Sequence, residues 1–327
     1  MRTIRISRQG FPPPSMHSWM RFMIFIMSKK YNVIVDNENP DIIFFTNYYQ
    51  NPNEYDSFLK RVPKIYDRSD MNKKFVFLSG EVADFSSITL SGENHWSLGY
   101  QKFTHPRYLR MPSYVIDAWT MFDESRIVDS PFSWLTKQSK YENVKNQFNK
   151  FCSVTQASNN EFRGKLFDIL TSYKQISSSG PWRQTLFNSE TLNKYEWQKS
   201  QYVGRCDGLT YREKIEFFKT CKFNICVHYT NTDYIIQEKL LHAFFANSVP
   251  LFFGNRFIEE DGLNPNKFIN LHKYEKIEDC LELVKKIDTD ESLHKKYIEE
   301  PIFVNNILPK YFDMDYLLSF FESIVEK

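Results

Sequence analysis

The chain has 327 residues, of which 42% are apolar and 25% charged, and this is the composition of a globular protein. Lys and Arg (42) nearly balance Asp and Glu (40), so the net charge is only +2. These values exclude a disordered chain, a collagen and a coiled coil, and they make a protein that coats nucleic acid a poor candidate. The length allows one large domain or two of medium size.

The cysteine pattern and the N-terminal charge bear on location. The five Cys residues are odd in number and form no CxxC pair, so we expect neither a disulfide scaffold nor a zinc site, and we predict a cytoplasmic protein. Residues 1–30 hold six Lys or Arg and no Asp or Glu. This run indicates either peripheral contact with an anionic membrane surface or substrate, or a basic strand and helix without a special role.

The first half of the chain alternates short apolar runs with helical stretches. Strands are predicted at residues 3–7, 31–35, 41–46 and 74–78, and a helix at 16–28. The longest apolar stretch, residues 19–27, is interrupted by Arg21 and is far shorter than the ~20 residues that span a bilayer. Strands separated by helices predict a parallel α/β sheet, and Glu81 directly follows its last predicted strand. Residues 113–147 are predicted to be an irregular connection.

A second alternating unit follows this connection. Strands are predicted at residues 151–155, 222–229, 249–253 and 268–271, and helices at 160–173, 236–246, 276–287 and 316–325. The predicted fold class is therefore α/β, with two sheet domains that face each other across a cleft. We place the domains at residues 1–147 and 148–327 and assign the terminal helix to the second.

The segment 233–241 lies between a buried strand and a helix, where free backbone N–H groups and the helix dipole favour an anion. Lys239 would add a point charge suited to phosphate, and Glu238 could accept hydrogen bonds from ribose hydroxyls. An ordinary surface Glu-Lys pair is the alternative. Glu238 and His242 also have the i, i+4 spacing of metal ligands, but no third ligand is evident, so we expect no metal here.

Two Asp-x-Asp segments, 288–290 and 313–315, have the form of an element that holds a divalent ion on a sugar diphosphate. Both directly precede predicted helices, where Asp is a favoured capping residue, and helix capping is the better interpretation. The chain contains no GxSxG, P-loop or GxGxxG motif. A serine hydrolase, a P-loop NTPase and a typical dinucleotide oxidoreductase are thereby disfavoured.

Three groups of segments, in order, resemble the signature of the α1,3-fucosyltransferases. Residues 77–81 (FLSGE) with 107–112 (RYLRMP) are similar to the "TGEN…RYLRMP" element of bacterial members. Residues 150–154 (KFCSV) with Arg163 are similar to "FASFVASN…R". Residues 222–227 (KFNICV), 234–240 (YIIQEKL) and 248–254 (SVPLFFG) are similar to "KFxLxFEN", "DYITEK" and "VPVxxG". The resemblance covers roughly residues 75–300.

The resemblance implies an inverting glycosyltransferase with two Rossmann-like domains, the GT-B arrangement, that uses GDP-fucose and needs no metal or other cofactor. Glu81 matches the general base, while Arg163 and Lys239 match the groups that hold the diphosphate. Glu238 matches the ribose ligand, and Tyr234 a donor-site tyrosine. The implied acceptor is an oligosaccharide or lipid-linked glycan with GlcNAc or glucose, in bacterial surface polysaccharide synthesis, with the protein cytoplasmic or peripheral at the inner membrane face.

The chain departs from the family pattern at the donor site. His228 and Tyr229 stand where the family has Glu-Asn, and Asn231 would replace the missing amide only if its loop is shifted. Two alternatives therefore stay open: the same fold with another nucleotide-sugar donor, and a catalytically silent module that binds a glycan or a nucleotide. Glu93, in the second Ser-Gly-Glu segment, is the alternative base.

Overall fold

The computed structural model describes residues 1–9, 15–46, 69–78, 92–121, 132–155, 161–179, 201–202, 211–228 and 238–327. The chain divides into two compact units. The first unit contains residues 1–126 and 309–327, and the second contains residues 127–308. Each unit is built on a sheet of six parallel strands, which confirms the predicted α/β class with two Rossmann-like units.

The first sheet has the strand order β2-β1-β3-β4-β5-β6. Its strands are β1 (Thr3–Gln9), β2 (Asn32–Val35), β3 (Ile42–Thr46), β4 (Lys74–Leu78), β5 (His95–Gly99) and β6 (Tyr108–Arg110). The helices of this unit are α1 (Ser15–Met27), α4 (Ser113–Met121) and α12 (Met314–Val325), the last preceded by the 3-10 turn η10 (Lys310–Phe312). Strand β4 is apolar on both faces because it is central in a parallel sheet: Phe75, Val76, Phe77 and Leu78 are all buried.

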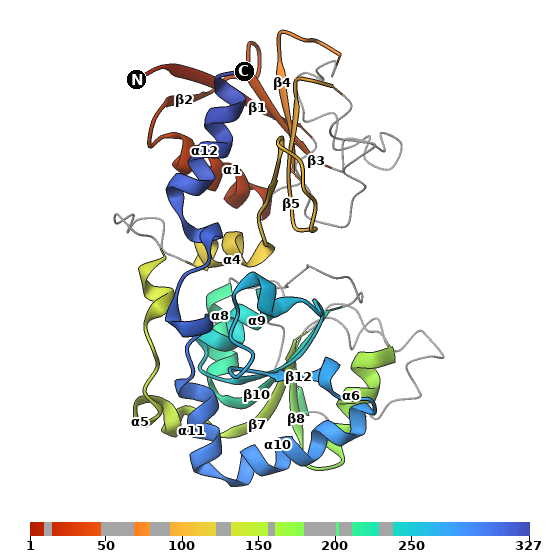
Figure 1. Cartoon of the computed structure of the whole chain (residues 1–327). Helices are drawn as coiled ribbons and strands as arrows, with labels where there is room; N and C mark the ends of the chain where they lie inside the picture. The colour runs from red at the N-terminus through yellow and green to blue at the C-terminus, as the bar shows by residue number, and fades with distance from the viewer. Residues whose placement is uncertain are drawn as a thin grey trace. The chain divides into compact units, whose positions relative to one another are not determined.

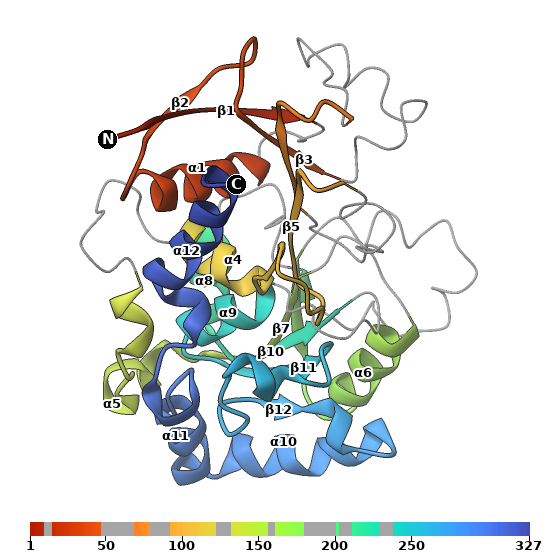
Figure 2. The same cartoon turned by 45° about the horizontal axis from the view of Figure 1, so that its top comes forward.

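The terminal helix α12 belongs to the first unit, so the prediction that it is part of the second domain is wrong. Its apolar face packs against α1, and the two helices lie side by side in Figures 1 and 2. The ring of Phe321 is fully buried, with its centroid 6.4 Å from that of Phe44 in β3. Lys30, just after α1, donates from Nζ to Oε1 of Glu322 at 2.6 Å. The period of an amphipathic helix shows that one face is covered, but not by which sheet.

The second sheet has the order β12-β11-β10-β7-β8-β9. Its strands are β7 (Lys150–Thr155), β8 (Ile176–Ser179), β9 (Gln201–Tyr202), β10 (Cys221–Val227), β11 (Val249–Phe253) and β12 (Ile269–Asn270). Its α-helices are α5 (Tyr141–Val144), α6 (Glu161–Thr171), α8 (Tyr211–Lys219), α9 (Glu238–Phe245), α10 (Cys280–Thr289) and α11 (Glu291–Glu299). The described 3-10 turns are η3 (Ser133–Thr136), η4 (Lys145–Gln147), η6 (Ile258–Asp261), η7 (Leu271–Lys273), η8 (Ile277–Asp279) and η9 (Val304–Asn306).

Helices cover both faces of this sheet. In Figure 1, α6 and α10 lie on one face and α8 and α9 on the other. Alternate residues of β10 divide accordingly: Phe223, Ile225 and Val227 join the buried cluster that α6 and α10 complete, while Cys226 faces α9, where its Sγ donates to the carbonyl of Lys239 at 3.4 Å. The first and fourth strands in sequence are adjacent at the centre, so the sheet is doubly wound.

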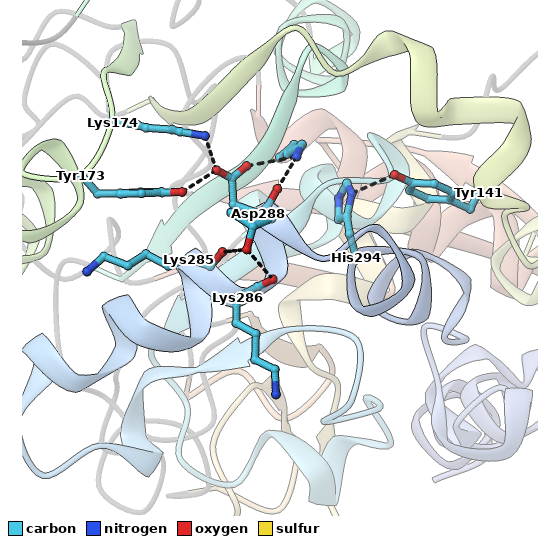
Figure 3. Close-up of polar contacts among 9 residues, drawn as sticks. Tyr141, Tyr173, Lys174, Lys285, Lys286, Asp288 and His294 are labelled. Carbon is cyan, nitrogen blue, oxygen red and sulfur yellow. Dashed lines mark hydrogen bonds and ion pairs between the residues drawn. The ribbon is translucent and has the colours of Figure 1, made fainter.

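A buried acid ties together the edge of the sheet where the strands begin (Figure 3). The side chain of Asp288, at the end of α10, is only 3% exposed. Its carboxylate accepts from Tyr173 Oη at 3.0 Å and from Lys222 Nζ at 3.0 Å, and it also pairs with Lys174. Lys222 Nζ additionally donates to the Asp288 carbonyl at 2.8 Å. The network links the segment before β8, the start of β10 and the end of α10.

Most of the predicted elements are confirmed to within a few residues, but the sequence also misjudged or missed several others. The described parts of residues 113–147 are not irregular throughout, because α4 and α5 fall within them. Strands β5 and β8 carried no strand signal, since polar residues such as Ser97 and Ser178 occupy fully buried positions in them. Within the described ranges no helix is both long enough and apolar enough to cross a membrane.

Candidate functional site

The centre of the second sheet is where a ligand site is expected. Strands β7 and β10 are neighbours, but the chain leaves β7 toward β8 on one side and leaves β10 toward β11 on the other. Helices α6 and α9, which follow these two strands, begin at the carboxyl edge on opposite faces (Figure 1). In open α/β sheets, ligands bind at such a reversal of strand order, outside the carboxyl ends of the strands.

Arg163 comes to this point from the first turn of α6. Its side chain is buried, at 3% exposure, and it crosses to the end of β10. The guanidinium donates to the carbonyl oxygen of Val227, from Nε at 3.0 Å and from Nη2 at 2.6 Å. Burial lowers the pKa of Arg163 to about 10, while the charge of Glu238 acts in the opposite direction. Arg163 therefore remains a cation at neutral pH and fixes α6 to the carboxyl end of β10.

Glu238 and Lys239 are the first two residues of α9, and both are partly exposed. They lie at the end of the helix where backbone N–H groups have no partner within the helix and where the dipole favours anions. Burial, opposed by the charge of Glu238 and aided by that of Arg163, lowers the pKa of Lys239 to about 8. Burial raises the pKa of Glu238, but Lys239 and other nearby positive groups outweigh this effect and keep it below its ordinary value. Glu238 is thus a carboxylate at neutral pH.

His242 lies one turn below Glu238 on α9 and is buried, at 3% exposure. Burial lowers its pKa to about 4, so the imidazole is neutral at pH 7. Its Nδ1 has no hydrogen-bond partner among the described residues. The described residues also contain no group of three His, Cys, Asp or Glu side chains that could hold a metal ion.

The carboxyl ends of β10 and β11 are closely packed. His228 follows β10 directly, is 6% exposed, and donates its backbone N–H to the carbonyl of Phe253 at 2.8 Å. A Cβ at Gly254 would come within 3.1 Å of the Phe252 ring and 3.5 Å of the His228 Cβ. A side chain at residue 254 would therefore crowd the Phe252 ring of the same strand, and His228 lies next to the carbonyl that Arg163 binds.

Three of the site residues predicted from the sequence are brought together here, namely Arg163, Glu238 and Lys239. Glu81, Tyr234 and Asn231 lie outside the described residues. Glu93, the alternative base, is exposed two residues before β5 begins. It therefore lies at the amino edge of the first sheet, opposite to the edge where parallel sheets carry ligand sites.

The helix-capping interpretation of the acidic pairs is confirmed for two aspartates. Asp290 accepts from the backbone N–H of Leu293 at 3.0 Å and caps α11. Asp313 accepts from the backbone N–H groups of Asp315 and Tyr316 at 2.9 and 3.2 Å and caps α12. Asp288 is engaged in the lysine network instead.

The sequence interpretation missed Lys214, on α8. Its charge acts on Glu238, Lys239 and His242. Helix α8 itself was not predicted, although residues 215 and 218 are apolar at the i, i+3 spacing of one helix face. This spacing, which ends four residues before the predicted strand at 222, is the signal that could have located the helix.

Comparison with known proteins is consistent with this geometry. Residues 171–300 match glycosyltransferase family 10 (fucosyltransferase), C-terminal part. The alpha-(1,3)-fucosyltransferase FucT of Helicobacter pylori is 24% identical over 340 aligned residues, which cover 93% of this chain. A crystal structure of an α1,3-fucosyltransferase with GDP superposes with a TM-score of 0.67 at 20% identity, covering 100% of this chain and 91% of that one. A structure of α1,3-fucosyltransferase with GDP-fucose gives 0.66 at 17% identity, covering 100% and 92%.

The chain spans 62% of the length of the H. pylori protein, so similarity to that protein concerns only part of it. The matched segment 171–300 contains Glu238 and Lys239, and the aligned region of the solved structures includes both sheets. The chain thus has the two-sheet GT-B fold of the α1,3-fucosyltransferase structures, and its residues 171–300 are similar to the C-terminal part of glycosyltransferase family 10 (fucosyltransferase).

Proposed function

We propose that the protein is an inverting fucosyltransferase that moves L-fucose from GDP-fucose to a hydroxyl of a glycan containing GlcNAc or glucose, with an α1,3-type linkage. The observation that carries this proposal is the meeting of Arg163, Glu238 and Lys239 at the reversal of strand order in the second sheet. Two cations and a carboxylate at a helix N-terminus suit a diphosphate joined to a ribose.

In this proposal the second unit binds the donor. Lys239 and Arg163 hold the diphosphate and stabilise the negative charge that develops on GDP as it leaves. Glu238, ionised and partly exposed, accepts hydrogen bonds from the ribose hydroxyls. Tyr234 and Asn231 complete the donor site.

The first unit binds the acceptor and supplies the base, Glu81. Its carboxylate takes the proton of the acceptor hydroxyl while that oxygen attacks the anomeric carbon of fucose. Attack on the face opposite GDP breaks the bond to the diphosphate and inverts the configuration. The reaction needs no metal or other cofactor, because Arg163 and Lys239 neutralise the leaving group.

The proposed setting is bacterial surface polysaccharide synthesis in the cytoplasm, with an oligosaccharide or lipid-linked acceptor. Peripheral contact with the inner membrane face would involve the basic N-terminus. Part of that charge is already paired within the protein, because Lys30 bonds Glu322 and Arg5 lies 3.8 Å from Asp36. Lys29 is exposed and is better placed for a membrane.

A donor screen tests the function. The protein is incubated with GDP-fucose, GDP-mannose, UDP-glucose and UDP-GlcNAc, with and without acceptor, and release of nucleotide is measured. GDP release from GDP-fucose that depends on acceptor, and that Lys239→Ala reduces at least tenfold, is the expected result. Lys276→Ala, at an exposed lysine before η8, is the matched control.

Two other outcomes correspond to the alternatives. The buried His228 at the end of β10, where the resembling family has Glu, favours testing other donors, and transfer from a UDP-sugar alone would replace GDP-fucose. Tight GDP binding without any release would identify a silent binding module. Absence of GDP binding would reject both transfer from GDP-fucose and a silent module that binds GDP.

A further inference from the structure

Helix α8 begins at the same edge of the second sheet as α6 and α9. It leads through Thr220 directly into the start of β10, so its own first turn lies toward the carboxyl end of that strand. Helices α8 and α9 pack on each other, and Figures 1 and 2 both show them side by side. Lys214 is the fourth residue of α8 and is partly buried. The start of α8 thus brings a third basic side chain to the cluster.

The charge of Lys214 acts on three side chains of α9, namely Glu238, Lys239 and His242. No ion pair within 4.0 Å joins Lys214, Glu238 or Lys239 to another side chain of the described residues. Lys214, Arg163 and Lys239 therefore place three cations around one carboxylate, while His242 is neutral. This is an excess of about two positive charges, which matches the diphosphate of a nucleotide sugar and exceeds what a neutral sugar would need.

We propose that Lys214 is the third cation of the donor diphosphate site, where it binds the phosphate that carries the sugar. This inference rests on the proposed function, because the diphosphate belongs to GDP-fucose. Burial of Arg163 and partial burial of Lys214 and Lys239 strengthen the effect of these cations on a bound anion. Burial is also the main cause of the low pKa of Lys239, which Arg163 and Lys214 lower as well. The diphosphate relieves this mutual repulsion when it binds.

Helix α8 offers a matched control. Lys219 lies five residues further along the same helix, and its Nζ bonds Oε1 of Glu216 at 2.6 Å on the exposed side. An ion pair at the protein surface contributes little to stability, and we expect Lys219 to contribute nothing to ligand binding. Replacement of Lys219 removes one positive charge from the same helix, as replacement of Lys214 does, but at a site away from α9.

The experiment measures GDP and GMP affinities by isothermal titration calorimetry for the wild type, Lys214→Met, Lys214→Gln and Lys219→Met. We expect both Lys214 variants to weaken GDP about tenfold or more, the loss of one charge-assisted hydrogen bond. The loss for GMP, which lacks the second phosphate, should be at most about threefold. Lys219→Met should bind both ligands as the wild type does. Lys214→Arg should recover most of the GDP affinity.

Unchanged GDP affinity in a folded Lys214 variant, or equal weakening of GDP and GMP, would overturn the inference and leave the proposed function standing. Failure of the wild type to bind GDP would instead reject the proposed function. If the wild type binds UDP in place of GDP, with the same dependence on Lys214, the donor is a UDP-sugar and the proposed contact of Lys214 with the diphosphate is supported. Thermal melting of each variant checks folding, and the two replacements of Lys214 guard against a single misfolded variant.

Discussion

Arg163 donates two hydrogen bonds to one carbonyl oxygen, that of Val227, at 3.0 and 2.6 Å. The contact joins α6, which follows β7, to the carboxyl end of β10. It therefore links the two strands between which the strand order reverses. Arg163 is therefore a structural clamp as well as a candidate ligand for phosphate. Its effect on binding has to be separated from its effect on folding, and its variants can do this.

Arg163→Ala should lower both the stability of the second unit and the affinity for GDP. Loss of the charge-assisted contact with Val227 should cost about 1.5–3 kcal/mol of unfolding free energy, measured by urea denaturation. Arg163→Lys keeps the charge but cannot form the two-pronged contact, so it should recover GDP affinity more than stability. If both properties recover in parallel in the Lys variant, the separation of the two roles is incorrect.

The affinity for GDP should fall as the pH rises above about 8. In the unliganded protein, burial lowers the pKa of Lys239 to about 8, and a bound diphosphate should raise it, so binding takes up a proton near that pH. Titration calorimetry from pH 7 to 9.5, in two buffers of different ionisation enthalpy, measures the uptake. Lys239→Met should bind GDP weakly and lose this uptake. An affinity independent of pH in the wild type would contradict the assignment.

Glu81→Gln should abolish transfer to the acceptor while GDP binding is retained, because a glutamine cannot take the proton of the hydroxyl. The measurement is acceptor-dependent GDP release together with GDP titration. Glu93→Gln serves as the control and should keep its activity, since Glu93 lies exposed at the amino edge of its sheet. Turnover that survives in the Glu81 variant would remove this residue from the base role.

Asp288→Asn should destabilise the second unit by about 3 kcal/mol at pH 7, because it leaves Lys174 and Lys222 without their buried partner. Lys174 and Lys222 hold the pKa of Asp288 below its ordinary value despite the opposing effect of burial. Its stabilisation is therefore present above about pH 4 and is lost as the pH falls through the lowered pKa. Urea denaturation at pH 7 and at pH 3 measures this loss, which should be smaller in the variant. Asp279→Asn, at an exposed aspartate, should leave stability nearly unchanged.

Phe321→Ala should destabilise the first unit by about 3–5 kcal/mol, since it empties the buried space beside Phe44. Hydrogen exchange should accelerate in β3 and α1 and remain unchanged in β10. Ser319→Ala, on the exposed side of the same helix, is the control. Faster exchange in β10 and not in β3 would show that the terminal helix stabilises the second unit instead of the first.

The sequence by itself determined the elements with strong periodic or apolar patterns, such as β4, β10 and α6, and from these the α/β class. It also predicted a helix start at residue 236, two residues before α9 begins, and a lysine near free backbone N–H groups there indicated a candidate anion site. Strand β8 could not be found in this way: Ser177, Ser178 and Ser179 are buried only because β7 and β9 supply backbone partners. The sheet, and not the side chains, makes that segment a strand.

Tertiary structure alone decided which partners the elements take. The periodicity of α12 requires a covering surface but does not specify the sheet, and the structure places the helix on the first unit. The strand order likewise decides that Arg163 meets Val227, 64 residues away in sequence, and that Lys214 lies beside the start of α9. Local patterns report burial and turn preference, whereas strand order arises from long-range pairing, which no short segment of the chain encodes.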